Sequence, residues 1–107
     1  MKISVREHAR FSADRMVKVG LATTPRVQLD LYCLEPGQEQ KAHAHGDQDK
    51  IYLVLEGRAR VVVEGGEAVL GAGEAALARA GQLHGLANPG PGRLLVAVVV
   101  SPPPPHA

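Results

Sequence analysis

Short runs of β-forming residues, separated by glycine turns, constrain the fold of this chain more than any other feature. The runs alternate between apolar and polar residues or are continuously apolar, which is typical of strands. The predicted strands are 26–34, 50–55, 58–64, 67–70, 75–78 and 93–100. Turn residues recur at intervals of about ten residues, as they do in sandwiches and barrels. The pattern therefore predicts an all-β fold and disfavours alternating strands and helices.

Glycine and proline residues mark the ends of these strands. Gly65-Gly66 predicts a tight hairpin, and Pro102–Pro105 cannot donate ladder hydrogen bonds, so the tail should leave the sheet after Ser101. Ser12–Lys18 predicts a short helical turn with Ser12 as its N-cap. With 107 residues the chain forms one domain. We divide it into an N-terminal arm (1–25), a β-barrel (26–100) and a proline-rich tail (101–107).

Composition excludes several classes of partner. Twelve Lys and Arg against eleven Asp and Glu give a net charge of +1, and no run of like charges recommends nucleic acid or an anionic membrane. The apolar run Leu94–Val100 is too short to span a bilayer. One cysteine, Cys33, excludes an internal disulfide and predicts a buried thiol. With a charged N-terminus that lacks an apolar leader, this predicts a cytoplasmic protein.

Three histidines suggest a metal site. His43 and His45 are two residues apart, so on one strand their rings would point to the same face. His84 follows a glycine turn much later in the chain, and a closed barrel can bring it to the other two. Neutral imidazole binds Zn, Fe, Mn, Ni and Cu, and three such ligands leave positions open for substrate. Each histidine alone would be read as an ordinary polar residue near a turn.

The spacing of these histidines resembles the two motifs of the cupin superfamily. The first, G-x5-H-x-H-x4-E-x6-G, is matched from Gly37 to Gly57, and the second, G-x5-P-x-G-x2-H-x3-N, from Gly73 to Asn88. Every glycine, histidine and asparagine of the motifs is in place. Two positions depart, because Lys50 replaces the glutamate and Arg79 replaces the proline. Within the superfamily the chain is similar to small stand-alone, single-domain cupins.

The resemblance implies a double-stranded β-helix, or jelly-roll barrel, that holds a divalent transition metal through His43, His45 and His84. It also implies a homodimer, since relatives with this fold usually dimerise. The expected function is that of a metal-binding small cupin, an enzyme of the oxygenase, isomerase or cyclase type that acts on a small organic molecule. The alternative is a non-catalytic module that binds or senses a small ligand or a metal.

Lys50 occupies the position that the resemblance gives to an anionic fourth ligand. An ammonium has no lone pair to donate, and its charge opposes a metal ion. In the preferred interpretation Lys50 turns aside and pairs with a carboxylate. Its candidate partners are Glu35, Glu39, Asp47 and Asp49. Alternatively, Asp49 replaces the glutamate as a ligand, although strand alternation puts it on the opposite face, or Lys50 acts on substrate as a catalytic residue.

Two further side chains are assigned roles. Tyr52 has the same strand parity as Lys50, so it is a candidate catalytic residue whose hydroxyl lines the cavity; the alternative is packing in the core. Asn88 is expected to hold the loop that follows it through its side-chain amide.

Overall fold

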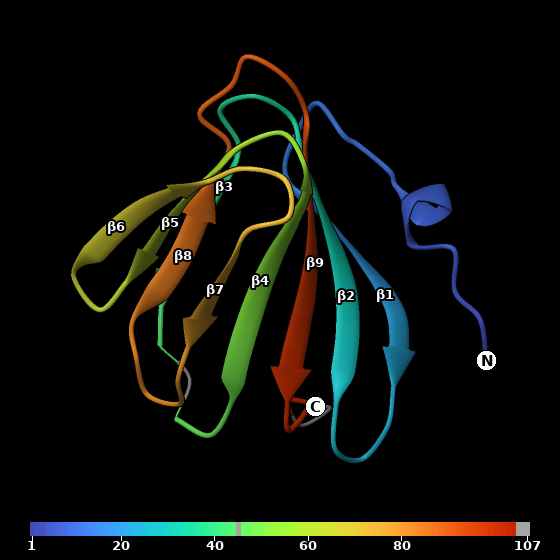
Figure 1. Cartoon of the computed structure of the whole chain (residues 1–107), viewed down its shortest axis with the longest axis vertical. Helices are drawn as coiled ribbons and strands as arrows, with labels where there is room; N and C mark the ends of the chain where they lie inside the picture. Colours follow the sequence, from blue (N-terminus) through green and yellow to red (C-terminus); the bar gives the residue numbers. More distant parts are fainter. Residues whose placement is uncertain (45, 105–107) are drawn as a thin grey trace.

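The protein folds into two antiparallel sheets that face each other, as the computed structural model shows for residues 1–44 and 46–104 (Figure 1). The five-stranded sheet has the order β1-β2-β9-β4-β7, and the four-stranded sheet has the order β3-β8-β5-β6. The strands are β1 Val17–Thr23, β2 Gln28–Leu34, β3 Glu39–His43, β4 Asp49–Glu56, β5 Ala59–Val63, β6 Gly66–Leu70, β7 Ala75–Ala78, β8 His84–Ala87 and β9 Leu94–Ser101. The prediction of an all-β jelly roll is confirmed.

Six strands were predicted to within two residues at each end, namely β2, β4, β5, β6, β7 and β9. The hairpin between β5 and β6 is also confirmed, although its turn is Glu64-Gly65, one residue earlier than the predicted Gly65-Gly66. Both turn residues have positive φ, as a tight two-residue turn requires. Bounds were not predicted for the other three strands, β1, β3 and β8. β8 is short, and β1 lies inside the segment that we had assigned to the N-terminal arm, so the barrel begins at Val17 and not at residue 26.

The N-terminal helical turn is at Val5–His8, named η1, and not at Ser12–Lys18. The prediction of a helical turn at Ser12 is wrong because the Ser12 hydroxyl accepts a hydrogen bond from the Asp14 amide at 3.2 Å, which stabilises a local polar turn. β1 then starts at Val17. The hydroxyl thus does form a capping-type bond, but no helix follows it.

The arm before β1 covers part of the outer face of the five-stranded sheet (Figure 1). Val5, Ala9 and Phe11 from the arm pack against a buried cluster. The cluster consists of Leu31, Cys33 and Leu95. The Arg10 amide donates to the Cys33 sulfur at 3.4 Å, and burial raises the pKa of this thiol. The prediction of a buried cysteine is confirmed.

The main hydrophobic core lies between the two sheets. Its central strand is β9, which pairs with β2 on one side and with β4 on the other. The inward side chains of β9 are all buried: Leu94, Val96, Val98 and Val100. Leu86 and Val61 of the four-stranded sheet close the core from the opposite side. No helix in the described part of the chain is long and apolar enough to cross a membrane.

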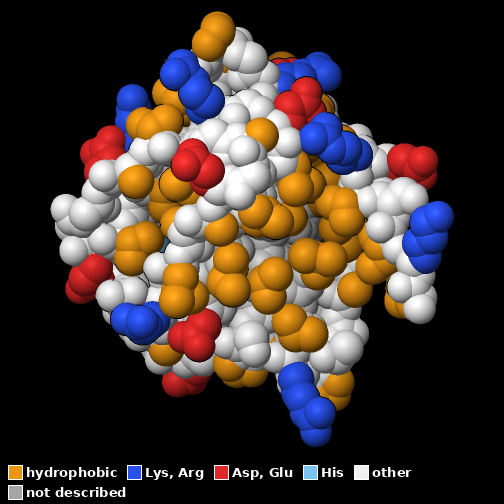
Figure 2. All heavy atoms as spheres, viewed as in Figure 1, with side chains coloured by type: hydrophobic (Ala, Val, Ile, Leu, Met, Phe, Trp, Pro, Cys, Tyr) orange, Lys and Arg blue, Asp and Glu red, His pale blue; other side chains and the backbone are white. Residues whose placement is uncertain are grey.

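Beyond the arm, the outer face of the five-stranded sheet stays apolar and open to solvent. Figure 2 shows a band of hydrophobic side chains across this face. Ile51 and Leu53 on β4 are 40% and 37% exposed, and Leu77 on β7 is 48% exposed. Ile51 and Leu77 are cross-strand partners, so their side chains lie next to each other.

Asn88 ties three segments together at the end of the barrel. Its side chain is 2% exposed, and its Nδ2 donates to the carbonyls of Leu34 and Gly92, each at 2.9 Å. Its Oδ1 accepts from the Gly90 amide at 2.8 Å. The prediction that this amide holds the following loop is confirmed, and the same side chain also fixes the end of β2.

Replacement of Asn88 should therefore be costly. We expect Asn88→Ala to lower the free energy of unfolding by about 2–4 kcal/mol, because it leaves buried backbone groups without their partner. Urea denaturation followed by circular dichroism measures the change. The control is Gln82→Ala, which removes one exposed side-chain bond to the Arg79 amide and should cost less than about 1 kcal/mol. Equal losses in the two variants would contradict this account.

Candidate metal and ligand site

Polar side chains enter the barrel on both sides of β9. Val100 pairs with Gln28 on β2 and with Lys50 on β4. Val98, two residues earlier on the same face, pairs with Asp30 on β2. Because paired residues point to the same side of a sheet, these polar side chains converge on one end of the barrel interior.

A β-bulge shapes the opposite wall. Gln40 on β3 pairs with Leu86 on β8, whereas His43, three residues later, pairs with His84, only two residues before Leu86. Two β3 residues therefore face the single residue Gly85. Regular alternation would send Gln40 and His43 to opposite faces, and the bulge turns both inward.

The bulge depends on the absence of a side chain at Gly85. A Cβ there would lie 2.8 Å from the Gln40 carbonyl oxygen and 2.9 Å from both the Cα and the amide nitrogen of Ala42. These are backbone atoms, so they cannot move aside cheaply. Gly85 thus lets β3 approach β8 closely enough to pair His43 with His84.

His43 and His84 are both held by the backbone through the same ring nitrogen, Nδ1. Their ring centroids are 4.6 Å apart. Nδ1 of His43 lies 2.9 Å from the Lys41 carbonyl, and Nδ1 of His84 lies 2.8 Å from the Gln82 carbonyl. A carbonyl only accepts hydrogen bonds, so each Nδ1 carries a proton and Nε2 of the neutral ring holds the lone pair. This tautomer is the one that ligates a metal through Nε2.

The third predicted ligand, His45, lies outside the described residues. Among residues 1–44 and 46–104, no group of three or more His, Cys, Asp or Glu side chains is placed to hold a metal ion. The structure brings two of the three predicted ligands together, and the complete set of three histidines stays a prediction.

A cavity of about 170 Å³ separates the two walls. It is lined by Lys18, Gln28, Asp30, Tyr32, His43, Gln48, Lys50, His84, Val100 and Pro104. Pro104 belongs to the proline-rich tail, which leaves the sheet after Ser101 as predicted and contributes to the cavity wall.

Lys50 points into this cavity and is only 6% exposed. The preferred prediction, that it turns aside to pair with a carboxylate, is wrong. The alternation of β4 places Lys50 on the same inward face as Tyr52 and Val54. Its Nζ donates to Gln40 Oε1 at 3.4 Å and lies 5.3 Å and 5.4 Å from the ring centroids of Tyr32 and Tyr52.

The protein environment disfavours the charged form of Lys50. Burial, the largest cause, and the charge of Lys18 lower the pKa of Lys50 to about 8, while Asp30 acts in the opposite direction. Burial raises the pKa of Tyr32 to about 12 and also raises the pKa of Tyr52. Both phenols are therefore neutral at physiological pH, and the ammonium is still largely charged.

Asp49 does not reach the cavity. Its side chain is exposed, and its Oδ1 accepts a hydrogen bond from the Ala80 amide at 2.9 Å, which ties the start of β4 to the turn after β7. The alternative in which Asp49 replaces the motif glutamate as a ligand is therefore wrong. The alternation of β4 places Asp49 on the face opposite Lys50.

Tyr52 is fully buried behind the cavity wall. Its hydroxyl donates to Gln40 Oε1 at 3.1 Å, and its ring centroid is 6.3 Å from that of His84. Gln40 Oε1 thus accepts from both Tyr52 and Lys50. This network links the β4 wall to the β3 wall and orients the Lys50 side chain.

Sequence reasoning missed the polar wall on β2. Gln28 Nε2 donates to Asp30 Oδ2 at 2.9 Å, and Asp30 is 7% exposed. The sequence did indicate a polar face on this strand, because Gln28, Asp30 and Tyr32 alternate with an apolar series. Part of that series is buried, but under the N-terminal arm on the outer side of the sheet.

Comparison with known proteins identifies the family. The family model for the cupin domain matches residues 30–100. The chain belongs to the cupin family. It is similar to the TT1209 protein of Thermus thermophilus, whose crystal structure is 40% identical with a TM-score of 0.93, over 96% of this chain and 98% of that one.

Other solved cupin-like structures agree. A Klebsiella pneumoniae protein with a double-stranded β-helix domain is 30% identical with a TM-score of 0.87, over 94% of this chain and 89% of that one. KdgF from Halomonas sp. is 26% identical with a TM-score of 0.82, over 92% and 90% of the two chains. A comparison with curated proteins finds no match.

The role of Gly85 can be tested directly. We expect Gly85→Ala to separate β3 from β8, to lower the free energy of unfolding by about 1–3 kcal/mol and to speed amide hydrogen exchange in β3. The matched control is Gly92→Ala, because a Cβ at Gly92 would meet no atom within 4 Å. If Gly85→Ala behaved like the control, the close approach at the bulge would not be needed.

Proposed function

We propose that this cupin is a metal-dependent enzyme that acts on a small organic molecule in the cavity of about 170 Å³. The observation that carries the proposal is the pair of His43 and His84. Their rings are neighbours, and each Nδ1 is held by a backbone carbonyl. Hydrogen bonds of this kind fix the ring orientation and the tautomer that a metal site needs.

The donor set fits a divalent transition metal of the zinc, iron, manganese, nickel or copper group. His43 and His84 would hold it through Nε2, with His45 as the third ligand that the motif predicts. Lys50 does not serve as a ligand while it is protonated. Three imidazole ligands would leave coordination positions open for substrate. The positive charge of Lys50 beside such a site would weaken metal binding.

The chemistry would be divided between the metal and the chain. A bound metal supplies a Lewis acid that polarises a carbonyl or enolate oxygen, or a site for dioxygen. Lys50, on the cavity wall, donates a hydrogen bond or a proton to the substrate. Gln40 and Tyr52 act as positioning residues, because they hold Lys50 in place through the shared Gln40 oxygen.

Two histidine variants test the predicted metal site. After loading with each of the five metals, the wild type should bind about one ion per chain. His43→Ala and His84→Ala should each weaken binding by at least about tenfold, since each removes a ligand. Elemental analysis and calorimetry measure stoichiometry and affinity.

His8→Ala is the control, because His8 is an exposed histidine on η1, outside the barrel. It should bind metal like the wild type. A wild type that stays metal-free with all five metals, or an unaffected His84→Ala variant, would overturn the metal site. Oxygen consumption with β-diketone, thiol and catechol substrates then tests catalysis; metal binding without turnover of any substrate would favour the alternative of a binding or sensor module.

We also propose that the protein forms a homodimer through the outer face of its five-stranded sheet. The exposed apolar band there, with Ile51, Leu53 and Leu77, supports this assignment (Figure 2). A two-fold dimer would remove the band from water, and a self-complementary face is what such symmetry requires.

Sedimentation velocity tests the interface. We expect the wild type to be a dimer at micromolar concentration and Leu77→Asp to raise the dissociation constant at least about tenfold, because it would bury a charge. Val69→Asp is a matched control, since Val69 is 52% exposed but lies on β6 of the other sheet. A monomeric wild type, or equal effects of the two variants, would contradict the assignment.

A further inference from the structure

Lys50 is a buried cation with few partners. An ammonium has three donors, and the Lys50 side chain has one hydrogen bond in the described part of the chain, a long one of 3.4 Å to Gln40. No salt bridge between described residues includes it. A charge on a side chain that is only 6% exposed normally has an anionic or strongly accepting partner, and Lys50 faces the cavity instead.

A second lysine lines the same cavity. The Lys18 Nζ lies 5.2 Å from the Tyr32 ring centroid, and the Lys50 Nζ lies 5.3 Å from it. Asp30 is the one carboxylate among the described residues that line the cavity. Two ammonium groups against one carboxylate leave an excess of one positive charge when the histidines are neutral. This excess matches a single negative charge on a ligand.

The size and polarity of the cavity restrict the ligand further. A protein cavity of about 150 Å³ holds one benzene molecule, so this cavity of about 170 Å³ suits a ligand of about six to eight non-hydrogen atoms. The β2 side of the wall offers the Asp30 carboxylate, which accepts hydrogen bonds, and the Gln28 amide beside it. A hydroxyl group on the ligand would satisfy both.

We propose that the cavity takes a small hydroxycarboxylic acid, whose carboxylate is bound by Lys50 and Lys18 and whose hydroxyl is bound by Asp30. The inference deepens the proposed function, because it names the substrate class of the same site. A carboxylate is favoured over phosphate or sulfate because Asp30 repels a second negative charge.

Lactate and its neutral isostere lactamide test the charge requirement. Calorimetry at pH 7 on chelator-treated, metal-free protein should show lactate binding at least about tenfold tighter than lactamide, as a charge-assisted bond predicts. Inorganic phosphate and sulfate should bind more weakly than lactate. Equal affinities for lactate and lactamide would overturn the proposal, and tighter binding of phosphate or sulfate would replace it with a simple anion site.

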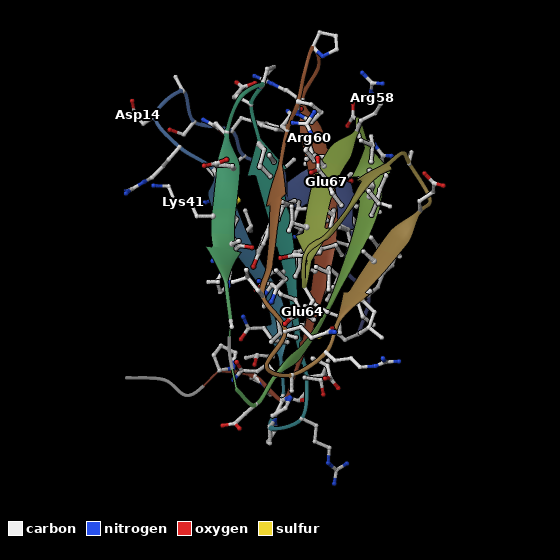
Figure 3. The ribbon with its side chains drawn as sticks, turned by 90° about the vertical axis from the view of Figure 1, so that its left-hand side faces the viewer. Asp14, Lys41, Arg58, Arg60, Glu64 and Glu67 are labelled. Carbon is white, nitrogen blue, oxygen red and sulfur yellow. The ribbon has the colours of Figure 1, made fainter. Side chains whose placement is uncertain are left out.

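Lysine variants test which side chains bind the carboxylate of lactate. Lys50→Met should weaken lactate binding at least about tenfold and raise the thermal unfolding midpoint, because it replaces a buried charge with an apolar group of similar volume. Lys18→Met should weaken binding less, since Lys18 is exposed to solvent. Lys41→Met is the control, because Lys41 is an exposed lysine of β3 that does not line this cavity (Figure 3). Unchanged lactate affinity in a folded Lys50→Met variant would refute the assignment.

Failure of this inference can be separated from failure of the proposed function. His84→Ala should lose metal and keep measurable lactate binding in the metal-free protein. Absence of lactate binding, with metal still bound through His43 and His84, would overturn the carboxylate site alone. Lactate binding by a wild type that takes up no metal would overturn the metal site and support this one.

Discussion

The pairing of β9 with two neighbours is the constraint on which the rest of the structure depends. Because its inward face is entirely aliphatic, β9 is buried at the centre of the five-stranded sheet and fixes the register of β2 and β4. Residues on those two strands that share a β9 partner are brought level with each other. Gln28 and Lys50, which share Val100 as a partner, enter one cavity for this reason, although 22 positions of sequence separate them.

The cavity lowers the stability of the fold that contains it. Burial moves the pKa of Lys50 from 10.5 to about 8, a shift worth on the order of 3 kcal/mol at neutral pH. The cost is present at pH values where the unfolded chain carries this charge, and it fades as the pH rises from about 8 through 10.5. The shift already includes the opposing effect of Asp30, which favours the charged form of Lys50. Groups that oppose folding in this way are concentrated at functional sites.

The sequence was sufficient for most strands and for the loop held by Asn88, because alternation, turn residues and motif spacing act locally. It did not reveal the bulge at Gly85, since that irregularity depends on how two distant strands pair. The orientation of Lys50 was misjudged because we weighed its charge above its strand parity. The polar wall at Asp30 was missed because both faces of β2 are buried, one by the second sheet and one by the arm.

The arm also determines the chemistry open to the single thiol of the chain. Cys33 lies beneath Phe11 and its neighbours, with its sulfur against the Arg10 amide, and its pKa is raised by burial. An alkylating reagent can reach the sulfur only after the arm has lifted from the sheet. The rate of alkylation would then report how often the arm detaches. Cys33 therefore serves as a probe of that motion on the face of β2 opposite the cavity, and no introduced label is needed.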